Sequence, residues 1–139
     1  MCTAKDIMRG EMVTIDPDAS VEQAIDLMLD RGLTGLPVVD GGSRLLGFLS
    51  EFDLLDLILE PRAGRSRVYE HMTRSPVVVG SDDDVSRVTS LFRSSSVCQL
   101  PVVHEGVLVG LVHRGDVLGY VLQMRRTSPL SAAASGVPC

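Results

Sequence analysis

Several classes of protein are excluded by what the sequence lacks. Tryptophan is absent and aromatic residues make up only 4% of the 139 residues, so a hydrophobic core must be built from Leu, Val, Ile and Met. The three cysteines, Cys2, Cys98 and Cys139, are far apart and include no Cys-x-x-Cys pair. This spacing argues against a disulfide framework or a zinc site and favours a reducing cytosol. We expect Cys98 to pack as a small hydrophobic side chain.

Long apolar runs and an excess of positive charge are also missing. No run approaches the roughly 20 apolar residues that span a bilayer, and the first residues lack the apolar stretch of a signal peptide. The net charge of −5 makes nucleic-acid or anionic-membrane binding unlikely, although one nucleotide needs only a few local donors. We therefore expect a cytoplasmic protein of one domain's length, without a membrane span.

An internal repeat organises the chain. Leu36-Pro37-Val38-Val39 returns 64 positions later as Leu100-Pro101-Val102-Val103, and the segment from Gly47 to Asp53 returns 63 positions later as Gly110 to Asp116. Lys5-Asp6-Ile7-Met8 is likewise matched by Tyr69-Glu70-His71-Met72. A self-match at fixed spacing indicates repeated structural units. Two copies are too few for a solenoid and favour a pseudo-two-fold pair.

Each copy predicts the order strand, helix, strand, strand, helix. In the first copy we expect a short strand over 12–15, a helix opened by the Ser20/Gln23 capping box and ended at Arg31-Gly32, strands over 33–39 and 45–49 around a turn at 41–43, and a helix from Ser50 to about 59. In the second copy we expect a short strand over 76–79, a helix starting at the acidic residues 82–84, and a last helix through about 124.

The predicted organisation is therefore a mixed α/β fold with two β-α-β-β-α repeats, a first repeat over 1–60, an arginine-containing linker over 61–67 and a second repeat over 68–126. Residues 127–139 are rich in Ser, Ala and Pro, and we expect a disordered tail there. The acidic run 82–84 fits a solvated helix start rather than a calcium loop.

These motifs, in this order and repeated at constant spacing, resemble the cystathionine β-synthase (CBS) domain, and the tandem pair resembles a Bateman module. The resemblance covers residues 5 to about 124. It implies two three-stranded sheets packed back to back, two clefts, and frequent dimerisation through helical faces. It also implies binding of an adenosine-containing ligand such as AMP, ADP, ATP or S-adenosylmethionine, as a regulatory ligand rather than a required cofactor, and control of a partner protein.

The resemblance carries specific roles to specific residues. Asp53 would contact the ribose and Ser50 the phosphate or sugar, because an ionised carboxylate can accept bonds from both ribose hydroxyls. Backbone near Thr14 and Gly35-Leu36-Pro37 would contact the adenine. The corresponding residues of the second copy are Val78, Gln99, Leu100, Pro101, His113, Arg114 and Asp116.

The motif Ser-x-x-Asp is also a helix capping box that needs no ligand, and both interpretations can hold together. His113 replaces the hydroxyl in the second copy, so Asp116 does not read as half of a Ser cap, which mildly favours a ribose role. Where many nucleotide-binding members carry His or Arg before Leu-Pro-Val, this chain has Thr34-Gly35 and Cys98-Gln99.

The two clefts should be unequal. Glu51 would repel phosphate in the first copy, whereas Arg114 in the second can bind it. We therefore predict that a phosphorylated nucleotide prefers the Asp116 cleft.

No catalytic constellation is visible in the sequence. His71, His104 and His113 lie at no mutual metal-ligand spacing and beside no plausible nucleophile. The sequence therefore predicts a non-enzymatic regulatory module that senses an adenosine-containing ligand. The alternative is a ligand-free dimerisation or interaction module. A homodimer is expected in both cases, because the second helix of each copy carries more apolar residues than one buried face needs.

Overall fold

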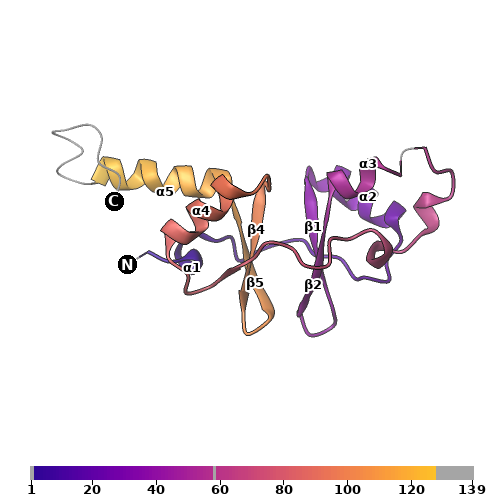
Figure 1. Cartoon of the computed structure of the whole chain (residues 1–139), viewed down its shortest axis with the longest axis horizontal. Helices are drawn as coiled ribbons and strands as arrows, with labels where there is room; N and C mark the ends of the chain where they lie inside the picture. Colours follow the sequence, from indigo (N-terminus) through magenta and orange to yellow (C-terminus); the bar gives the residue numbers. More distant parts are fainter. Residues whose placement is uncertain (1, 58, 128–139) are drawn as a thin grey trace. The chain divides into compact units, whose positions relative to one another are not determined.

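The computed structural model describes residues 2–57 and 59–127, and Figure 1 labels most of their helices and strands. They divide into two compact units. Unit 1 is drawn from the segments Met1–Gly10, Val78–Val102 and Val109–Cys139, and unit 2 from Glu11–Val77 and Val103–Leu108. The predicted mixed α/β class is confirmed, because both units combine short strands with helices.

Unit 2 contains the helices α2 (Val21–Arg31) and α3 (Glu51–Leu55), the strands β1 (Gly35–Val39) and β2 (Leu45–Ser50), and the 3-10 helices η1 (Ala63–Arg65) and η2 (Val68–Glu70). The predicted capping box is present: Gln23 N–H donates to Ser20 Oγ at 3.1 Å, and Ser20 N–H donates to Gln23 Oε1 at 2.9 Å. α2 ends at Gly32, whose φ of 63° is left-handed, as predicted.

The helix after Ser50 is shorter than expected. α3 ends at Leu55, and the chain then continues in turns closed by the hydrogen bonds from Leu57 N–H to Leu54 O and from Glu60 N–H to Leu57 O. Pro61 lies just ahead, and a residue before proline is disfavoured in the helical conformation. The expectation that the apolar run continued the helix to residue 59 was therefore wrong.

The expected strand over 12–15 is reduced to a single parallel bridge between Ile15 and Val38. Ile15 N–H donates to Pro37 O at 3.0 Å and Val39 N–H to Ile15 O at 3.1 Å. The next bond of a parallel ladder would need an N–H on Pro37, which proline lacks. Unit 2 therefore holds the two-stranded sheet β1-β2 rather than the three-stranded sheet that the resemblance implied.

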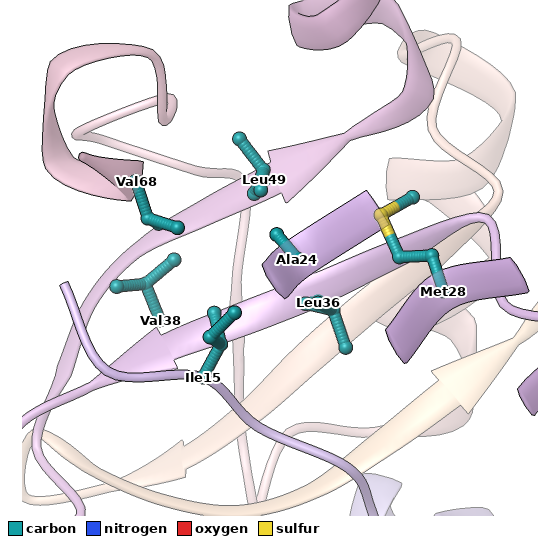
Figure 2. Packing of buried hydrophobic residues seen from close by; sticks show 7 residues of the cluster. All are labelled: Ile15, Ala24, Met28, Leu36, Val38, Leu49 and Val68. Carbon is teal, nitrogen blue, oxygen red and sulfur yellow. The ribbon is translucent and has the colours of Figure 1, made fainter. Parts of the chain in front are cut away.

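The core of unit 2 is aliphatic, as the composition requires. One face of α2 packs against buried side chains of β1, β2 and η2, as Figure 2 shows; the cluster comprises Ile15, Ala24, Met28, Leu36, Val38, Leu49 and Val68. Ile25 of α2 lies outside this cluster and is exposed.

Unit 1 contains the helices α1 (Ala4–Ile7), α4 (Val85–Ser94) and α5 (Arg114–Thr127) and the strands β3 (Val79–Gly80), β4 (Gln99–His104) and β5 (Val107–His113). The strand order is β3-β4-β5, with residues 103–108 of β4 and β5 assigned to unit 2. Asp84 caps α4 by accepting a 2.8 Å bond from Ser86 N–H, so the acidic run is a helix start.

α5 extends one residue beyond its predicted end at Arg125-Arg126. It includes Thr127, whose Oγ1 donates to the Gln123 carbonyl at 3.0 Å, so the expected tail does not begin at that residue. The rest of the expected tail, residues 128–139, lies outside the described part of the chain.

The short segments that contain Met8-Arg9 and Met72-Thr73 dock on glycine-containing strands. Arg9 and Leu111 exchange two backbone hydrogen bonds, and so do Thr73 and Phe48. A Cβ on Gly47 would lie 2.7 Å from both Met72 Sδ and Thr73 O. Glycine is thus needed at Gly47 because the docked segment lies so close.

Repeats in the sequence and compact units in space are therefore different divisions of the chain. The segment that opens the first copy belongs to unit 1, which is built on the strands of the second copy. The segment that opens the second copy, including Thr73, belongs to unit 2. The repeat boundaries at 1–60 and 68–126 remain a division of the sequence.

Candidate functional site

Asp53 lies in the first turn of α3 and is held by Ser50 at the end of β2. Asp53 Oδ2 accepts 2.8 Å and 3.1 Å bonds from the backbone N–H and the hydroxyl of Ser50, and Asp53 N–H donates to Ser50 Oγ at 3.3 Å. The capping interpretation is therefore confirmed. Asp53 Oδ1 accepts a long bond, 3.3 Å, from the hydroxyl of Thr73. Oδ2 therefore caps the helix, whereas Oδ1 makes a weak hydrogen bond.

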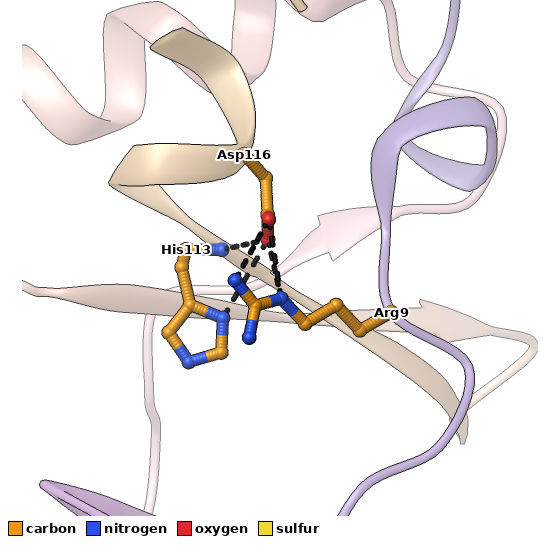
Figure 3. A network of polar contacts seen from close by, with 3 residues as sticks. All are labelled: Arg9, His113 and Asp116. Carbon is orange, nitrogen blue, oxygen red and sulfur yellow. Dashed lines mark hydrogen bonds and ion pairs between the residues drawn. The ribbon is translucent and has the colours of Figure 1, made fainter. Parts of the chain in front are cut away.

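Asp116 occupies the same place at the start of α5, as Figure 3 shows. His113 N–H donates to Asp116 Oδ2 at 2.8 Å, so Asp116 makes half of a capping box even without a serine. Asp116 is not half of a Ser cap, as expected, but it still has a capping role because the carboxylate needs only the backbone N–H.

Arg9 completes the Asp116 cluster. Its Nε lies 3.1 Å and 3.2 Å from the two carboxylate oxygens, and its Nη2 lies 3.1 Å from Oδ1. The Asp116 side chain is 15% exposed, whereas the Arg9 side chain is 59% exposed. The result is a fixed carboxylate paired with a guanidinium that faces solvent.

The pKa of the Asp116 carboxyl reflects two opposed effects. Burial raises it, but the His113 backbone N–H and the Arg9 guanidinium outweigh burial and bring the pKa below its usual value of 3.8. Asp116 is therefore ionised at neutral pH. His113 Nδ1 is buried and lies 3.5 Å from Asp116 Oδ2, too far for a strong bond.

All the predicted site residues of one copy fall within one unit. Unit 2 holds the predicted residues of the first copy: Thr14, Gly35, Leu36, Pro37, Ser50 and Asp53. Unit 1 holds those of the second copy: Val78, Gln99, Leu100, Pro101, His113, Arg114 and Asp116. Gly35 pairs with Ser50 across β1 and β2, and Glu51 N–H donates to Thr34 O. In unit 1 the equivalent bond runs from Arg114 N–H to Cys98 O. The start of each central strand is thereby fixed beside the start of the following helix.

Burial limits what these residues can offer. All five central-strand residues are buried: Leu36, Pro37, Gln99, Leu100 and Pro101. These positions can offer backbone, as the predicted adenine contact requires, but little side-chain surface. Thr14 and Val78 are half-buried and lie just before the bridge residue Ile15 and the strand β3.

Arg114 is exposed, and its Nη2 lies 3.4 Å from Cys98 Sγ. Cys98 is itself exposed, so the expectation that it packs as a core side chain was wrong. It precedes the buried stretch of β4 rather than belonging to it.

Sequence reasoning missed Thr73 and Arg9. They are equivalent in the repeat, each following the methionine of its segment by one position. That alignment was visible in the sequence. What it did not show is that the segment of one copy docks on the strand of the other.

Among residues 2–57 and 59–127, no three His, Cys, Asp or Glu side chains are grouped so that they could hold a metal ion. Within the same residues, no helix is both long and apolar enough to cross a bilayer.

A strand-helix repeat with a capping aspartate after each second strand is the architecture of the CBS domain. The family model for this domain matches residues 4–60 and 68–123, most of the chain. The chain therefore belongs to the CBS domain family and carries the domain twice.

The chain is similar in sequence to named CBS-domain proteins, and similar in fold to a solved structure of one of them. The chain is 30% identical over 133 residues to the CBS domain-containing protein YhcV of Bacillus subtilis, which covers 95% of this chain and 93% of that protein. It is 29% identical over 149 residues to the chloroplastic protein CBSX2 of Arabidopsis thaliana, covering 85% of this chain; it spans only 62% of that relative's length. A crystal structure of CBSX2 in complex with AMP superposes with a TM-score of 0.82 at 32% identity, covering 89% of this chain and 98% of that chain.

The chain is also similar to a short part of an enzyme. Inosine-5′-monophosphate dehydrogenase of Korarchaeum cryptofilum is 32% identical over 115 residues, which make up 82% of this chain but only 23% of the enzyme.

Proposed function

We propose that this chain is a non-enzymatic regulatory module that binds an adenosine-containing ligand at Asp53 and at Asp116. The observation that carries the proposal is the pair of fixed carboxylates at equivalent places in the two copies, each beside the start of a central strand. The AMP complex of the relative CBSX2 supports the class of ligand.

The chemistry of the two carboxylates suits a ribose. In each site Oδ2 accepts the backbone N–H three residues earlier, which fixes the direction of the carboxylate. The remaining acceptor capacity, at Asp53 directly and at Asp116 once Arg9 moves aside, can take hydrogen bonds from a vicinal diol, because an ionised carboxylate has about four lone-pair positions. Backbone groups at Gly35 and Gln99 would then contact the adenine, and Ser50 would contact the ribose or phosphate in unit 2. AMP, ATP and S-adenosylmethionine all present this adenosine portion.

Regulation requires that the ligand bind two conformations with different affinity, since a ligand with equal affinity for both shifts nothing. We propose that a partner protein responds to the conformation that the ligand stabilises. A homodimer and a cytoplasmic location form part of this proposal; the relative CBSX2 is named as chloroplastic.

A thermal-shift screen with AMP, ATP and S-adenosylmethionine tests the proposal. A ligand at 100 times its dissociation constant should stabilise the folded protein by about 2.7 kcal/mol. The shift should shrink in Asp53→Asn and Asp116→Asn, which remove the charge but keep an acceptor for the capping N–H. Asp30→Asn is the matched control, because Asp30 is exposed and its ion-pair partner, at 3.6 Å, is its exposed sequence neighbour Arg31. The absence of a shift with all three ligands would refute the proposal.

A second candidate function is a ligand-free interaction module, and exposed apolar side chains favour it. Phe52 on α3 is 81% exposed and Leu118 on α5 is 70% exposed, with Leu55 and Leu122 also exposed nearby on the same helices. Large apolar side chains in water mark candidate contact surfaces. Substituting Phe52 and Leu118 by Glu should then abolish self-association, and AMP should neither bind nor change it.

A further inference from the structure

The residue that follows Met8 or Met72 contacts the candidate ribose carboxylate in both units, yet its chemistry differs. Thr73 places a neutral hydroxyl 3.3 Å from Asp53 Oδ1. Arg9 places a guanidinium on Asp116, as Figure 3 shows. Both residues are anchored in the same way, by paired backbone hydrogen bonds with Phe48 and Leu111. The two sites therefore share the same backbone arrangement but differ in the side chain that contacts the carboxylate.

The acceptor capacity of the two carboxylates differs as a result. At Asp116, His113 N–H occupies Oδ2 and Arg9 engages both oxygens. Little of the roughly four lone-pair positions is left for a diol while Arg9 stays in place. At Asp53, Oδ1 loses only one long bond from Thr73 when a diol arrives. A ribose thus has to displace Arg9 at one site and only a hydroxyl at the other.

We propose that Arg9 is a specificity residue of the Asp116 site, which it makes selective for a nucleoside 5′-phosphate over the nucleoside. An uncharged nucleoside must break the ion pair and leaves the guanidinium uncompensated. A nucleotide supplies a phosphate that the displaced guanidinium binds in a forked arrangement. Because the Arg9 side chain is largely exposed, it can move while the backbone of its segment stays bonded to Leu111. This inference rests on the proposed function.

The test is a nuclear magnetic resonance titration of the full chain with AMP and with adenosine. The backbone amide of His113 reports on the Asp116 site, and that of Ser50 reports on the Asp53 site, since each donates to its carboxylate. The variant is Arg9→Thr, which copies the residue of the other unit. Lys5→Thr is the matched control: it removes one positive charge from the same segment, and Lys5 pairs with Asp82 at 3.1 Å rather than with Asp116.

In Arg9→Thr we expect adenosine to bind the Asp116 site about threefold more tightly, because a solvent-facing ion pair no longer competes for the carboxylate. AMP should bind this site about threefold more weakly, because the guanidinium that would bind its phosphate is gone. The AMP-to-adenosine affinity ratio of the Asp116 site, measured at the His113 amide, should therefore fall about tenfold. The ratio of the Asp53 site, measured at the Ser50 amide, should not change. Lys5→Thr should leave both ratios as they are. The reciprocal variant Thr73→Arg should raise the ratio at Ser50.

Each other outcome counts against the inference. An unchanged ratio in Arg9→Thr, with both ligands still bound at His113, overturns it and leaves the proposed function standing. An equal fall in Lys5→Thr would show a general effect of charge and overturn it too. If neither ligand shifts either amide in the unsubstituted protein, the proposed function and the inference both fail. If Arg9→Thr does not fold, Thr73→Arg decides: a ratio at Ser50 that does not rise refutes the role of the guanidinium.

Discussion

Replacing Gly47 by alanine should destabilise unit 2 because the docked segment leaves no room for a methyl group. The added Cβ would lie 2.7 Å from the Thr73 carbonyl oxygen and 2.7 Å from Met72 Sδ. The methionine can rotate away, but the carbonyl cannot move without weakening the two backbone bonds between Thr73 and Phe48. Overpacking costs about 1–3 kcal/mol, and each backbone bond contributes about 1 kcal/mol. We expect a total loss of about 2–3 kcal/mol.

Thermal and urea unfolding, followed by circular dichroism, measure this loss. A loss of that size should lower Tm by about 8–12 °C for a chain of this length. Gly119→Ala is the matched control, because a Cβ at Gly119 on α5 meets nothing within 4 Å. There the better helix propensity of alanine should raise stability by up to about 1 kcal/mol. If Gly47→Ala is as stable as the unsubstituted protein, the segment does not dock on β2 as described.

Two further predictions concern acid stability and assembly. The pKa of Asp116 lies below 3.8 in the folded protein, so its stabilising pair with Arg9 is fully present above pH 3.8 and is lost as the pH falls through the lowered pKa. Asp116→Asn should therefore be about 0.5–1 kcal/mol less stable at pH 7. In urea titrations the difference should shrink as the pH falls through the lowered pKa. Light scattering at micromolar concentration should give twice the mass of one chain, and Leu118→Glu should halve it; a monomer before substitution would contradict the dimer.

Local signals in the sequence predicted much of the fold, because they act within a few residues. Ser20 and Gln23 satisfy each other's backbone, and Gly32 takes the left-handed conformation that ends α2. The sequence did not predict that the strand over 12–15 would be reduced to one bridge, because this depends on which backbone N–H groups of β1 face Ile15. Pro37 decides it only once that pairing is known.

The candidate site was predicted in part for the same reason. Asp53, Asp116 and the residues beside them follow from a motif within one copy. Arg9 and Thr73 reach those carboxylates from the other copy, through contacts across more than 100 residues in the case of Arg9 and Asp116. Periodicity and capping rules describe neighbours along the chain and carry no information on such a pairing. The exposure of Cys98 could not be predicted either, because a small apolar residue beside a buried strand can still face solvent.

The most direct test of the proposed function changes the ligand and leaves the protein intact. Isothermal titration should compare AMP with its 2′,3′-dideoxy counterpart, which keeps the adenine and the phosphate but lacks the diol that Asp53 and Asp116 would bind. A hydrogen bond to a charged group contributes about 1.5–3 kcal/mol, so we expect the dideoxy compound to bind at least about tenfold more weakly. Equal affinities for the two compounds would contradict a ribose-binding role for these carboxylates.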